Sequence, residues 1–248
     1  VMGGVPRKWG IPRYAVLTPD RLFPSAVFVL TKETIMKKSM IIGMVSLLTI
    51  SNVNALEVRP FIGGNLSVSG VTWTEELKNT MKDYEWELPV AFAGAGFEAG
   101  ARFKTDSIYS AAITFAYDYM FNSKFSIDEV SHQYIDKIET GFSVVSITFD
   151  NYLRVSGNAK HQQNLVLGVG AAYATERGTI TVTEYGEENG LSDSKFSDSM
   201  PAFVAKLGYN FQLVENTDLF VNGRVFIPDH NDDVDAMFNA SVGLRFVF

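Results

Sequence analysis

The chain has 248 residues, of which 46% are hydrophobic and 13% aromatic, and its mean hydropathy is close to zero. Apolar residues must therefore be spread among polar ones instead of lying in long blocks. The chain has no cysteine, which excludes disulfides, Cys-ligated zinc and thiol catalysis. Its formal net charge of −7 argues against nucleic acid as a partner, because nucleic acid binds basic surfaces.

The long apolar run near the start of the chain is predicted to belong to a secretory signal peptide. The run covers residues 40–50 and follows a start residue, Met36, and two lysines. Its 11 residues are too few for a spanning helix, which needs roughly 20. Residues 53–55 resemble a cleavage site, so residues 36–55 are predicted to be a signal peptide that is cleaved after Ala55. The alternative is a buried core helix.

Residues 1–35 precede this segment and show no clear periodicity. They begin with Val and carry five basic residues and four prolines. Our interpretation is that translation begins at Met36 and that residues 1–35 come from an over-extended gene model. The alternative is an unusually long n-region, and in either case the segment is excluded from fold prediction.

From Leu56 onward the hydrophobic pattern alternates with a period of two, and no segment shows a convincing helical period. In residues 108–121, one face is apolar from Tyr109 to Phe121, whereas the other is mostly small or polar. Segments of this length are long for a soluble protein, where strands of about 5–6 residues are usual, but they suit tilted strands that cross a membrane. Eight segments are predicted to be strands: 57–69, 89–103, 108–121, 142–155, 164–176, 201–214, 219–228 and 237–248.

The connections between these strands alternate between long and short. The long ones are 70–88, 122–141 and 177–200, the short ones are 104–107, 156–163 and 215–218, and the seventh, 229–236, belongs to the long-loop end. The part of the chain after residue 55 has 14 basic and 26 acidic residues, and the four connections at the long-loop end carry net charges of −3, −2, −3 and −4. All the net charge is therefore predicted at one end of the molecule. Long external loops opposite short periplasmic turns are typical of outer-membrane barrels.

Charged residues within the strands indicate which face points inward. They lie on the small or polar face, whereas the aromatic face would crowd a narrow lumen if it pointed inward. Residues 56–248 are therefore predicted to form an all-β fold, an eight-stranded antiparallel up-and-down transmembrane β-barrel, which also satisfies every backbone hydrogen bond in lipid. The charges are expected to pair with one another inside the barrel, because an unpaired buried charge costs several kcal/mol. This predicted lumen charge network consists of Arg59, Glu98, Arg102, Asp118, Asp150, Arg154, Lys206, Arg224 and Arg245.

The last eight residues, Ser-Val-Gly-Leu-Arg-Phe-Val-Phe, alternate and end on an aromatic residue. With the signal peptide and the eight segments, they make residues 56–248 similar to the small outer-membrane β-barrel family, the OmpA/OmpX-type transmembrane domain and the opacity-type surface antigens. The resemblance implies that Gly243, Phe246 and Phe248 form the assembly signal read by the periplasmic barrel-assembly machinery. The sequence departs from full-length OmpA, in which a periplasmic peptidoglycan-binding domain follows the barrel, so the resemblance does not imply anchoring to the cell wall.

The sequence offers little catalytic or metal-binding chemistry. Its three histidines, at positions 132, 161 and 230, share no strand end with a serine nucleophile and an orienting acid, so we expect no enzyme activity and no cofactor. Asp229, Asn231, Asp233 and Asp235 alternate as in part of a calcium loop, but the glycine and distal glutamate of such a loop are missing, so we expect a solvated acidic tip and no metal site. Eight strands enclose a lumen just wide enough for side chains, so little or no conductance is expected.

Aromatic side chains in the acidic loops are the candidates for binding a partner, and the alternative is that they pack within the loops above the barrel rim. The predicted function is therefore that of a Gram-negative outer-membrane surface antigen or adhesin that contacts host or cell-surface molecules, outer-membrane lipid and lipopolysaccharide. The alternatives are a purely structural membrane-stabilising barrel and a narrow porin-like channel of low conductance. The candidate loop residues are Trp73, Tyr84, Trp86, Tyr134, Tyr185 and Phe196.

Overall fold

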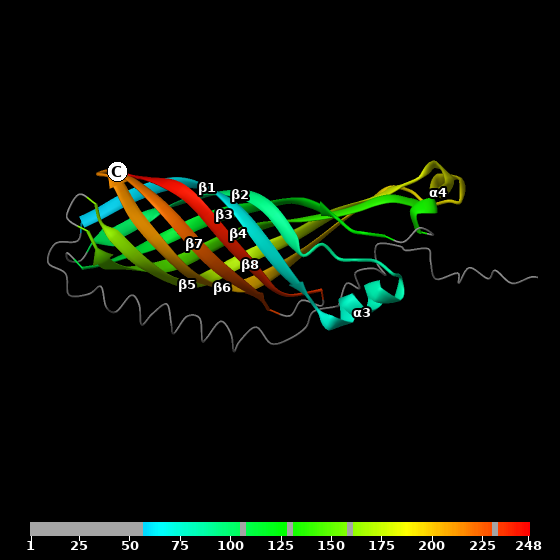
Figure 1. Cartoon of the computed structure of the whole chain (residues 1–248), viewed down its shortest axis with the longest axis horizontal. Helices are drawn as coiled ribbons and strands as arrows, with labels where there is room; N and C mark the ends of the chain where they lie inside the picture. The colour runs from blue at the N-terminus through cyan, green and yellow to red at the C-terminus, as the bar shows by residue number, and fades with distance from the viewer. Residues whose placement is uncertain (1–56, 105–107, 128–130, 158–160, 230–232) are drawn as a thin grey trace, which may run out of the picture.

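The computed structural model of the chain describes residues 57–104, 108–127, 131–157, 161–229 and 233–248 (Figure 1). The predicted leader, residues 1–35, and the predicted signal peptide, residues 36–55, lie outside these residues.

Eight strands in the described ranges form one closed ring in which each strand pairs antiparallel with the next along the chain and β8 pairs with β1. The predicted eight-stranded antiparallel up-and-down barrel is thereby confirmed. Closure gives the β1 and β8 edges a partner in the register Ser67↔Ser241, so the barrel has no open seam. The strands are β1 (Glu57–Trp73), β2 (Ala91–Lys104), β3 (Tyr109–Lys124), β4 (Ile135–Ser156), β5 (Gln163–Val182), β6 (Ser194–Val214), β7 (Thr217–Pro228) and β8 (Val234–Val247).

Short connections and the C-terminus lie at one end of the barrel, which we call the inner end, and the long connections lie at the other, the outer end (Figure 1). At the outer end β4, β5 and β6 begin or end about seven residues beyond their predicted boundaries, at Ile135, Val182 and Ser194. These extensions, residues 135–141, 177–182 and 194–200, project beyond the other strands, and we call them the arm (Figure 1). Much of the predicted second and third loops is therefore strand, because a two-residue alternation continues there with mostly polar residues on its outward face.

The prediction that no helix follows Leu56 is wrong for the first and third loops. Helix α3 (Glu75–Asp83) starts at the N-cap Thr74, whose side chain accepts a hydrogen bond from the Leu77 backbone N–H. It buries only Leu77 and Met81, and so short an apolar stripe is hard to recognise in sequence. The shorter elements are η1 (Ser131–Gln133) and α4 (Glu184–Glu188). No helix in the described part of the chain is long and apolar enough to cross a membrane.

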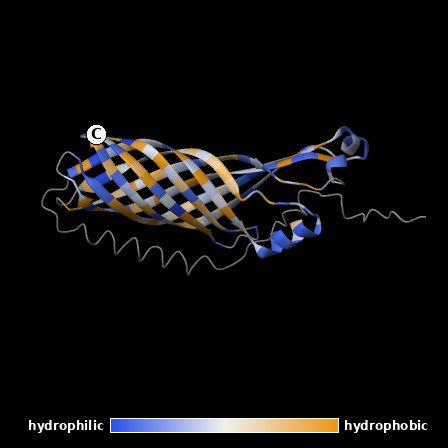
Figure 2. Ribbon diagram, viewed as in Figure 1, coloured by the Kyte–Doolittle hydropathy of each residue, from blue (hydrophilic) through white to orange (hydrophobic). Residues whose placement is uncertain are grey.

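The outward face of the barrel exposes large apolar side chains. Hydrophobic and hydrophilic residues alternate along each strand (Figure 2). Leu66 is 68% exposed and Leu207 58%, whereas the neighbouring inward residues Asn65 and Lys206 are buried. We call the outward apolar residues the apolar belt. The belt includes Leu66, Val68, Phe97, Ile113, Phe115, Val145, Ile147, Leu167, Tyr173, Leu207, Val221, Phe238, Val242 and Leu244.

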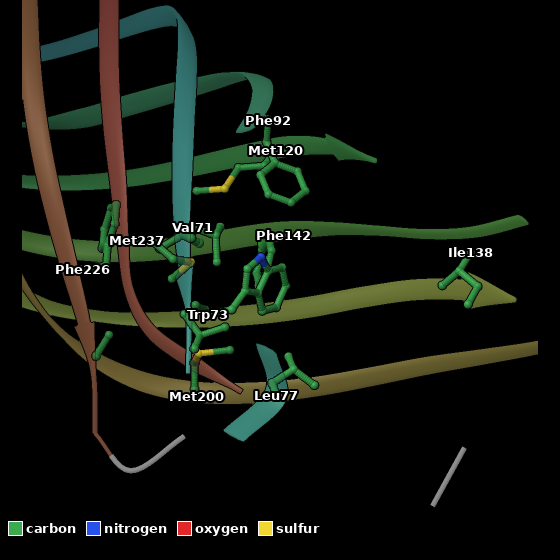
Figure 3. Packing of buried hydrophobic residues seen from close by; sticks show 14 of the residues in the cluster. Val71, Trp73, Leu77, Phe92, Met120, Ile138, Phe142, Met200, Phe226 and Met237 are labelled. Carbon is green, nitrogen blue, oxygen red and sulfur yellow. The ribbon is translucent and has the colours of Figure 1, made fainter. Parts of the chain in front are cut away.

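The interior differs between the two halves of the barrel. Charged and amide side chains are buried toward the inner end, as the alternation predicts. Toward the outer end the inward residues are apolar and form one cluster with the cap helix α3, whose Leu77 lies beside Trp73 in Figure 3. The charged face is therefore only half of the interior, and a hydrophobic core lies above it.

Candidate functional site

The centre of the charged region is the Arg245 guanidinium, which is buried among residues from four other strands. Its Nε donates to Glu98 Oε1 at 2.8 Å, and its Nη1 donates to the Tyr152 hydroxyl at 2.7 Å. The guanidinium also lies 4.4 Å from the ring centroid of Phe61 and 5.1 Å from that of Phe220. These aromatic faces and the carboxylate give the buried cation partners on several sides.

A second cation, Lys206, extends this arrangement across the lumen. Its Nζ lies 2.8 Å from Asp150 Oδ2 and 3.9 Å from Glu98 Oε2, and all three side chains are almost fully buried. Thr114 donates a further hydrogen bond of 2.8 Å to the same Asp150 oxygen. Four predicted network members, Glu98, Asp150, Lys206 and Arg245, are thus in one connected group.

The remaining predicted charges fall into smaller groups. Arg224 binds both oxygens of Asp118, with Nη2 to Oδ1 at 2.9 Å. Arg102 pairs at 3.0 Å with Asp218, which also accepts from Asn210 Nδ2 at 2.8 Å. Asp218, Tyr152, Thr114 and Asn210 were missed by the sequence analysis, although the alternation through Phe220 and Asn222 would have placed Asp218 inward.

Two predicted members stand apart from the network. Arg59 lies in register with Arg102 at the inner mouth of the lumen, where its side chain is 37% exposed and pairs with Glu57 at 2.6 Å instead of with another network member. It is only the third residue of β1, at the open inner mouth, where water solvates it. Arg154 is half-buried at the same end, and its Nε is buried with no hydrogen-bond partner in the described residues.

The outer end is closed by two of the candidate loop aromatics, Trp73 and Trp86. Trp73 is 1% exposed, donates from Nε1 to the Pro89 carbonyl at 2.7 Å and packs 6.0 Å from Phe142, centroid to centroid. Trp86 is 5% exposed and donates to Ser131 Oγ at 3.1 Å. Both tryptophans therefore follow the alternative, packing at the rim, because they belong to the hydrophobic core that also contains Leu77 and Met81 of α3. Figure 3 shows Trp73 within this core.

The other four loop aromatics are more accessible. Tyr84 is 43% exposed and Tyr185 50%, whereas Tyr134 and Phe196 are partly buried. Phe196 lies across Gly178 on the neighbouring strand, where an added Cβ would stand 2.0 Å from its ring. Glycine at this position therefore allows the arm strands to approach closely.

The tip of the arm is a rigid pair of tyrosines. The rings of Tyr134 and Tyr185 lie 5.2 Å apart at an interplanar angle of 55°. The two loops that carry them are joined by Thr183, whose N–H donates to the Tyr134 carbonyl at 3.0 Å and whose hydroxyl donates to the Gln133 carbonyl at 2.5 Å. The tip therefore presents a preorganised aromatic surface, in which Tyr185 is half exposed to solvent and Tyr134 is partly buried.

A buried carboxyl, Glu176, lies beyond the apolar belt where β5 enters the arm. Thr140 donates to it at 2.8 Å, and its side chain is almost completely buried. Burial raises the pKa of Glu176 to about 7, the Thr140 hydrogen bond opposes this, and the nearby Asp233 and Asp198 raise the pKa further. The sequence alone does not reveal this group, because Glu176 is the last residue of an ordinary predicted strand.

The predicted assembly-signal residues are at the inner end on β8 and just beyond it. Phe246 and Phe248 point outward and are 51% and 72% exposed. Gly243 lies against Phe220, and an added Cβ would stand 2.2 Å from the Gly64 carbonyl oxygen of the paired strand. The calcium-like tip has Asn231 outside the described residues, and within the described ranges no cluster of three His, Asp or Glu side chains could hold a metal ion. His132 and His161 lie at opposite ends of the chain's barrel, in η1 and before β5, and His230 is outside the described residues.

This geometry defines a class of protein, the small up-and-down β-barrel with ion pairs inside and apolar side chains outside. No family model and no curated protein matches the chain by sequence. In fold the chain is similar to Ail, the attachment invasion locus protein of Yersinia pestis. The match has 16% sequence identity and a TM-score of 0.47, and it covers 77% of this chain and 99% of Ail. It is also similar to the outer membrane protein OprG of Pseudomonas aeruginosa (10% identity, 78% of this chain, 97% of that chain, TM-score 0.47). Neisserial surface protein A is a further match (13% identity, 76% of this chain, 97% of that chain, TM-score 0.40).

Proposed function

We propose that this chain is a β-barrel of the Gram-negative outer membrane that acts as a surface antigen or adhesin through its arm. The membrane location is supported by the inverted arrangement of the barrel, which buries Glu98 and Lys206 and exposes residues such as Leu66 and Leu207. Water favours the opposite arrangement, and a contiguous exposed apolar belt around a closed barrel fits the acyl region of a bilayer. Outer-membrane lipid and lipopolysaccharide are then direct partners of the belt, and the barrel-assembly machinery is the partner of the assembly signal at Phe248.

The lumen in this proposal is filled and does not conduct. Ion pairs cross it toward the inner end, where Arg245 meets Glu98 and Lys206 meets Asp150. The apolar cluster with Trp73 and α3 occupies the outer end. An eight-stranded barrel has room for little more than these side chains, which disfavours the narrow porin-like channel.

The observation that carries the binding role is the arm itself. Three strands continue past the belt and hold Tyr134 and Tyr185 in ring contact at their tip. A structural barrel needs no such projection, whereas rigid exposed aromatic side chains are well suited to contact another molecule. The partner is a host or cell-surface molecule, and no catalytic step is part of the proposal.

The test is removal of the tip and the outer part of the arm without loss of the barrel. Residues 125–138 and 180–194 are each replaced by Asn-Gly, which joins Lys124 to Glu139 and Thr179 to Lys195, two pairs that already face each other in the ladder. Cells that display the shortened barrel should lose at least about 10-fold in adherence, while heat-modifiable gel migration shows the barrel still folded.

A milder pair of variants separates the tip from the rest of the arm. Tyr185→Ala should reduce adherence, whereas Tyr84→Ala, an equally exposed tyrosine on the cap, should leave it unchanged. Full adherence of the shortened barrel would instead favour the second candidate, a structural barrel that only stabilises the membrane.

A further inference from the structure

Four of the six basic residues of the outer end lie on one outside wall of the barrel. The four connections predicted at this end contain six basic residues and a large excess of acids. Two of the six, Lys78 and Lys82, lie on α3. The other four are Lys124 on β3, Lys137 on β4, Arg177 on β5 and Lys195 on β6, and we call them the basic face.

The ladder registers place the basic face on adjacent strands. Lys124 faces Glu139 on β4, Glu139 faces Thr179 on β5, and Thr179 faces Lys195 on β6. Directly paired residues in an antiparallel ladder point to the same side of the sheet. This row points outward, because the residues that alternate with it, such as Ile138 and Ile180, are buried inside the arm.

Arg177 and Lys137 lie in the rows on either side. Arg177 faces Ser197 on β6, one row nearer the belt than Lys195, and Lys137 faces Thr181, one row farther out. Neighbouring strands are about 4.8 Å apart, so the four cations span about 15 Å across the wall. Two acidic residues lie near these cations: Glu139 pairs with Lys137 at 3.5 Å, and Asp193, just before β6, accepts a hydrogen bond from the Val182 N–H at 2.8 Å.

The basic face begins where the apolar belt ends. Tyr173 is the last large belt residue on β5, and the next outward position, Thr175, is hydrogen-bonded to Ser199 on β6 at 3.1 Å. Arg177 follows directly, and its guanidinium folds back to lie 4.7 Å from the ring centroid of Tyr119. Tyrosines at such a border mark the headgroup level of a membrane barrel, so the cations lie at and just above the lipid headgroups.

The cations of the basic face keep binding capacity for an anion. Lys124 and Lys195 are exposed and form no ion pair with the part of the chain that the structure describes. The Nε of Arg177 is buried and has no hydrogen-bond partner there. Cations side by side repel one another, and the surrounding loops already carry the net negative charge, so an anionic ligand would be directed to this wall.

We propose that the basic face binds the phosphate groups of an anionic outer-leaflet lipid, with lipid A of lipopolysaccharide as the ligand. The inference rests on the proposed membrane location. Guanidinium and ammonium groups are the usual phosphate ligands, and their height above the belt matches a phosphate whose acyl chains lie against Phe115, Val145 and Tyr173. The acidic loops elsewhere at the outer end would repel the same lipid, so binding is confined to the β3–β6 side.

The test compares two variants with equal loss of charge. Lys124→Gln with Lys195→Gln removes two exposed cations of the basic face, and Lys78→Gln with Lys82→Gln removes two cations of α3. Each protein is inserted into phosphatidylcholine nanodiscs that contain bisphosphorylated lipid A as a minor component, and bound lipid A is measured by native mass spectrometry. Near-surface basic residues strengthen anionic-lipid binding about five-fold each, so the first variant should retain lipid A about 25-fold more weakly and the α3 variant as well as the wild type.

Two further experiments identify the source of the phosphate and distinguish loss of binding from loss of folding. Inorganic phosphate added in excess should not displace lipid A, and Arg177→Lys should retain more lipid A than Arg177→Gln. Equal retention by the two double variants, or displacement by inorganic phosphate, would overturn the inference. If the wild-type barrel shows heat-modifiable migration and inserts into phosphatidylcholine but does not bind lipid A, only this inference is refuted. Failure of the barrel to insert would refute the proposed membrane location.

Discussion

Arg245 on β8 and Glu98 on β2 meet inside the barrel with both side chains fully buried, and they connect positions 147 residues apart in the chain. The pair also touches Lys206 and Tyr152, so it joins four strands at one point. A buried pair of this kind requires both members, because either charge alone would be desolvated without compensation.

Glu98→Gln should therefore destabilise the barrel by about 3–5 kcal/mol, measured as the free energy of unfolding by urea in detergent or lipid. The exposed pair at the inner mouth provides the control, and Glu57→Gln should cost less than about 1 kcal/mol. Replacing both members, as Glu98→Leu with Arg245→Leu, should recover much of the loss. An effect of Glu98→Gln as small as that of Glu57→Gln would show that the network does not stabilise the fold.

The same network, with the apolar cluster above it, is expected to block ion flow. In planar bilayers the purified barrel should give no large, stable openings, because Arg245 and Lys206 fill the inner half and Trp73 and Phe142 the outer half. Single-channel recordings with long openings of uniform size would contradict this prediction and would favour the porin-like alternative.

Trp73 anchors the cap helix to the barrel mouth. Trp73→Ala should cost about 3–5 kcal/mol, since it leaves a cavity beside Phe142 and removes the hydrogen bond to the Pro89 carbonyl. Thermal unfolding and near-ultraviolet circular dichroism would report the loss. Tyr84→Ala, at an exposed site on the same loop, is the matched aromatic control, and a similar loss for both variants would mean that Trp73 is not an anchor.

Glu176 should make the stability of the outer end depend on pH. Burial raises the pKa of Glu176 from 4.5 to about 7, so between these pH values the folded state holds a proton that the unfolded chain has released. The unfolding free energy should accordingly be highest below pH 4.5 and fall by up to about 3 kcal/mol as the pH rises through 7. Glu176→Gln should remove this dependence in denaturant titrations at several pH values. The exposed Glu187→Gln should keep it, and an unchanged pH profile in Glu176→Gln would refute the assignment.

Phe248 is expected to matter for assembly in cells and not for stability. Its side chain is 72% exposed on the outside of the barrel, so Phe248→Ala should leave refolding into detergent micelles nearly unchanged. The amount of folded barrel in outer-membrane fractions should fall several-fold if the residue is read by the assembly machinery. Wild-type amounts of folded Phe248→Ala barrel in cells would contradict the assembly signal.

The two-residue alternation was enough to predict the ring of eight antiparallel strands and to orient their faces. Each strand repeats the same pattern, with apolar residues outside and small or polar residues inside. Because the pattern recurs in eight segments, the inverted orientation would place many polar residues in lipid and many large apolar residues in the lumen. The positions of Glu98, Asp118, Asp150, Lys206, Arg224 and Arg245 follow from that rule. The strand ends in the arm did not follow from that rule. Their outward residues, such as Lys137, Thr179 and Lys195, are polar, so the sequence there is similar to that of a loop.

What the sequence determined by itself is the barrel, since alternation along a strand depends only on local order. Which charges pair was decided by the tertiary structure, because Arg245 and Glu98 are neighbours only after the ring closes and the register between β1 and β8 is set. The same holds for Trp73 and Trp86, whose burial depends on a helix folding back over the mouth. It holds for the basic face as well, where four cations scattered from position 124 to 195 become one surface only through the pairing of β3 to β6.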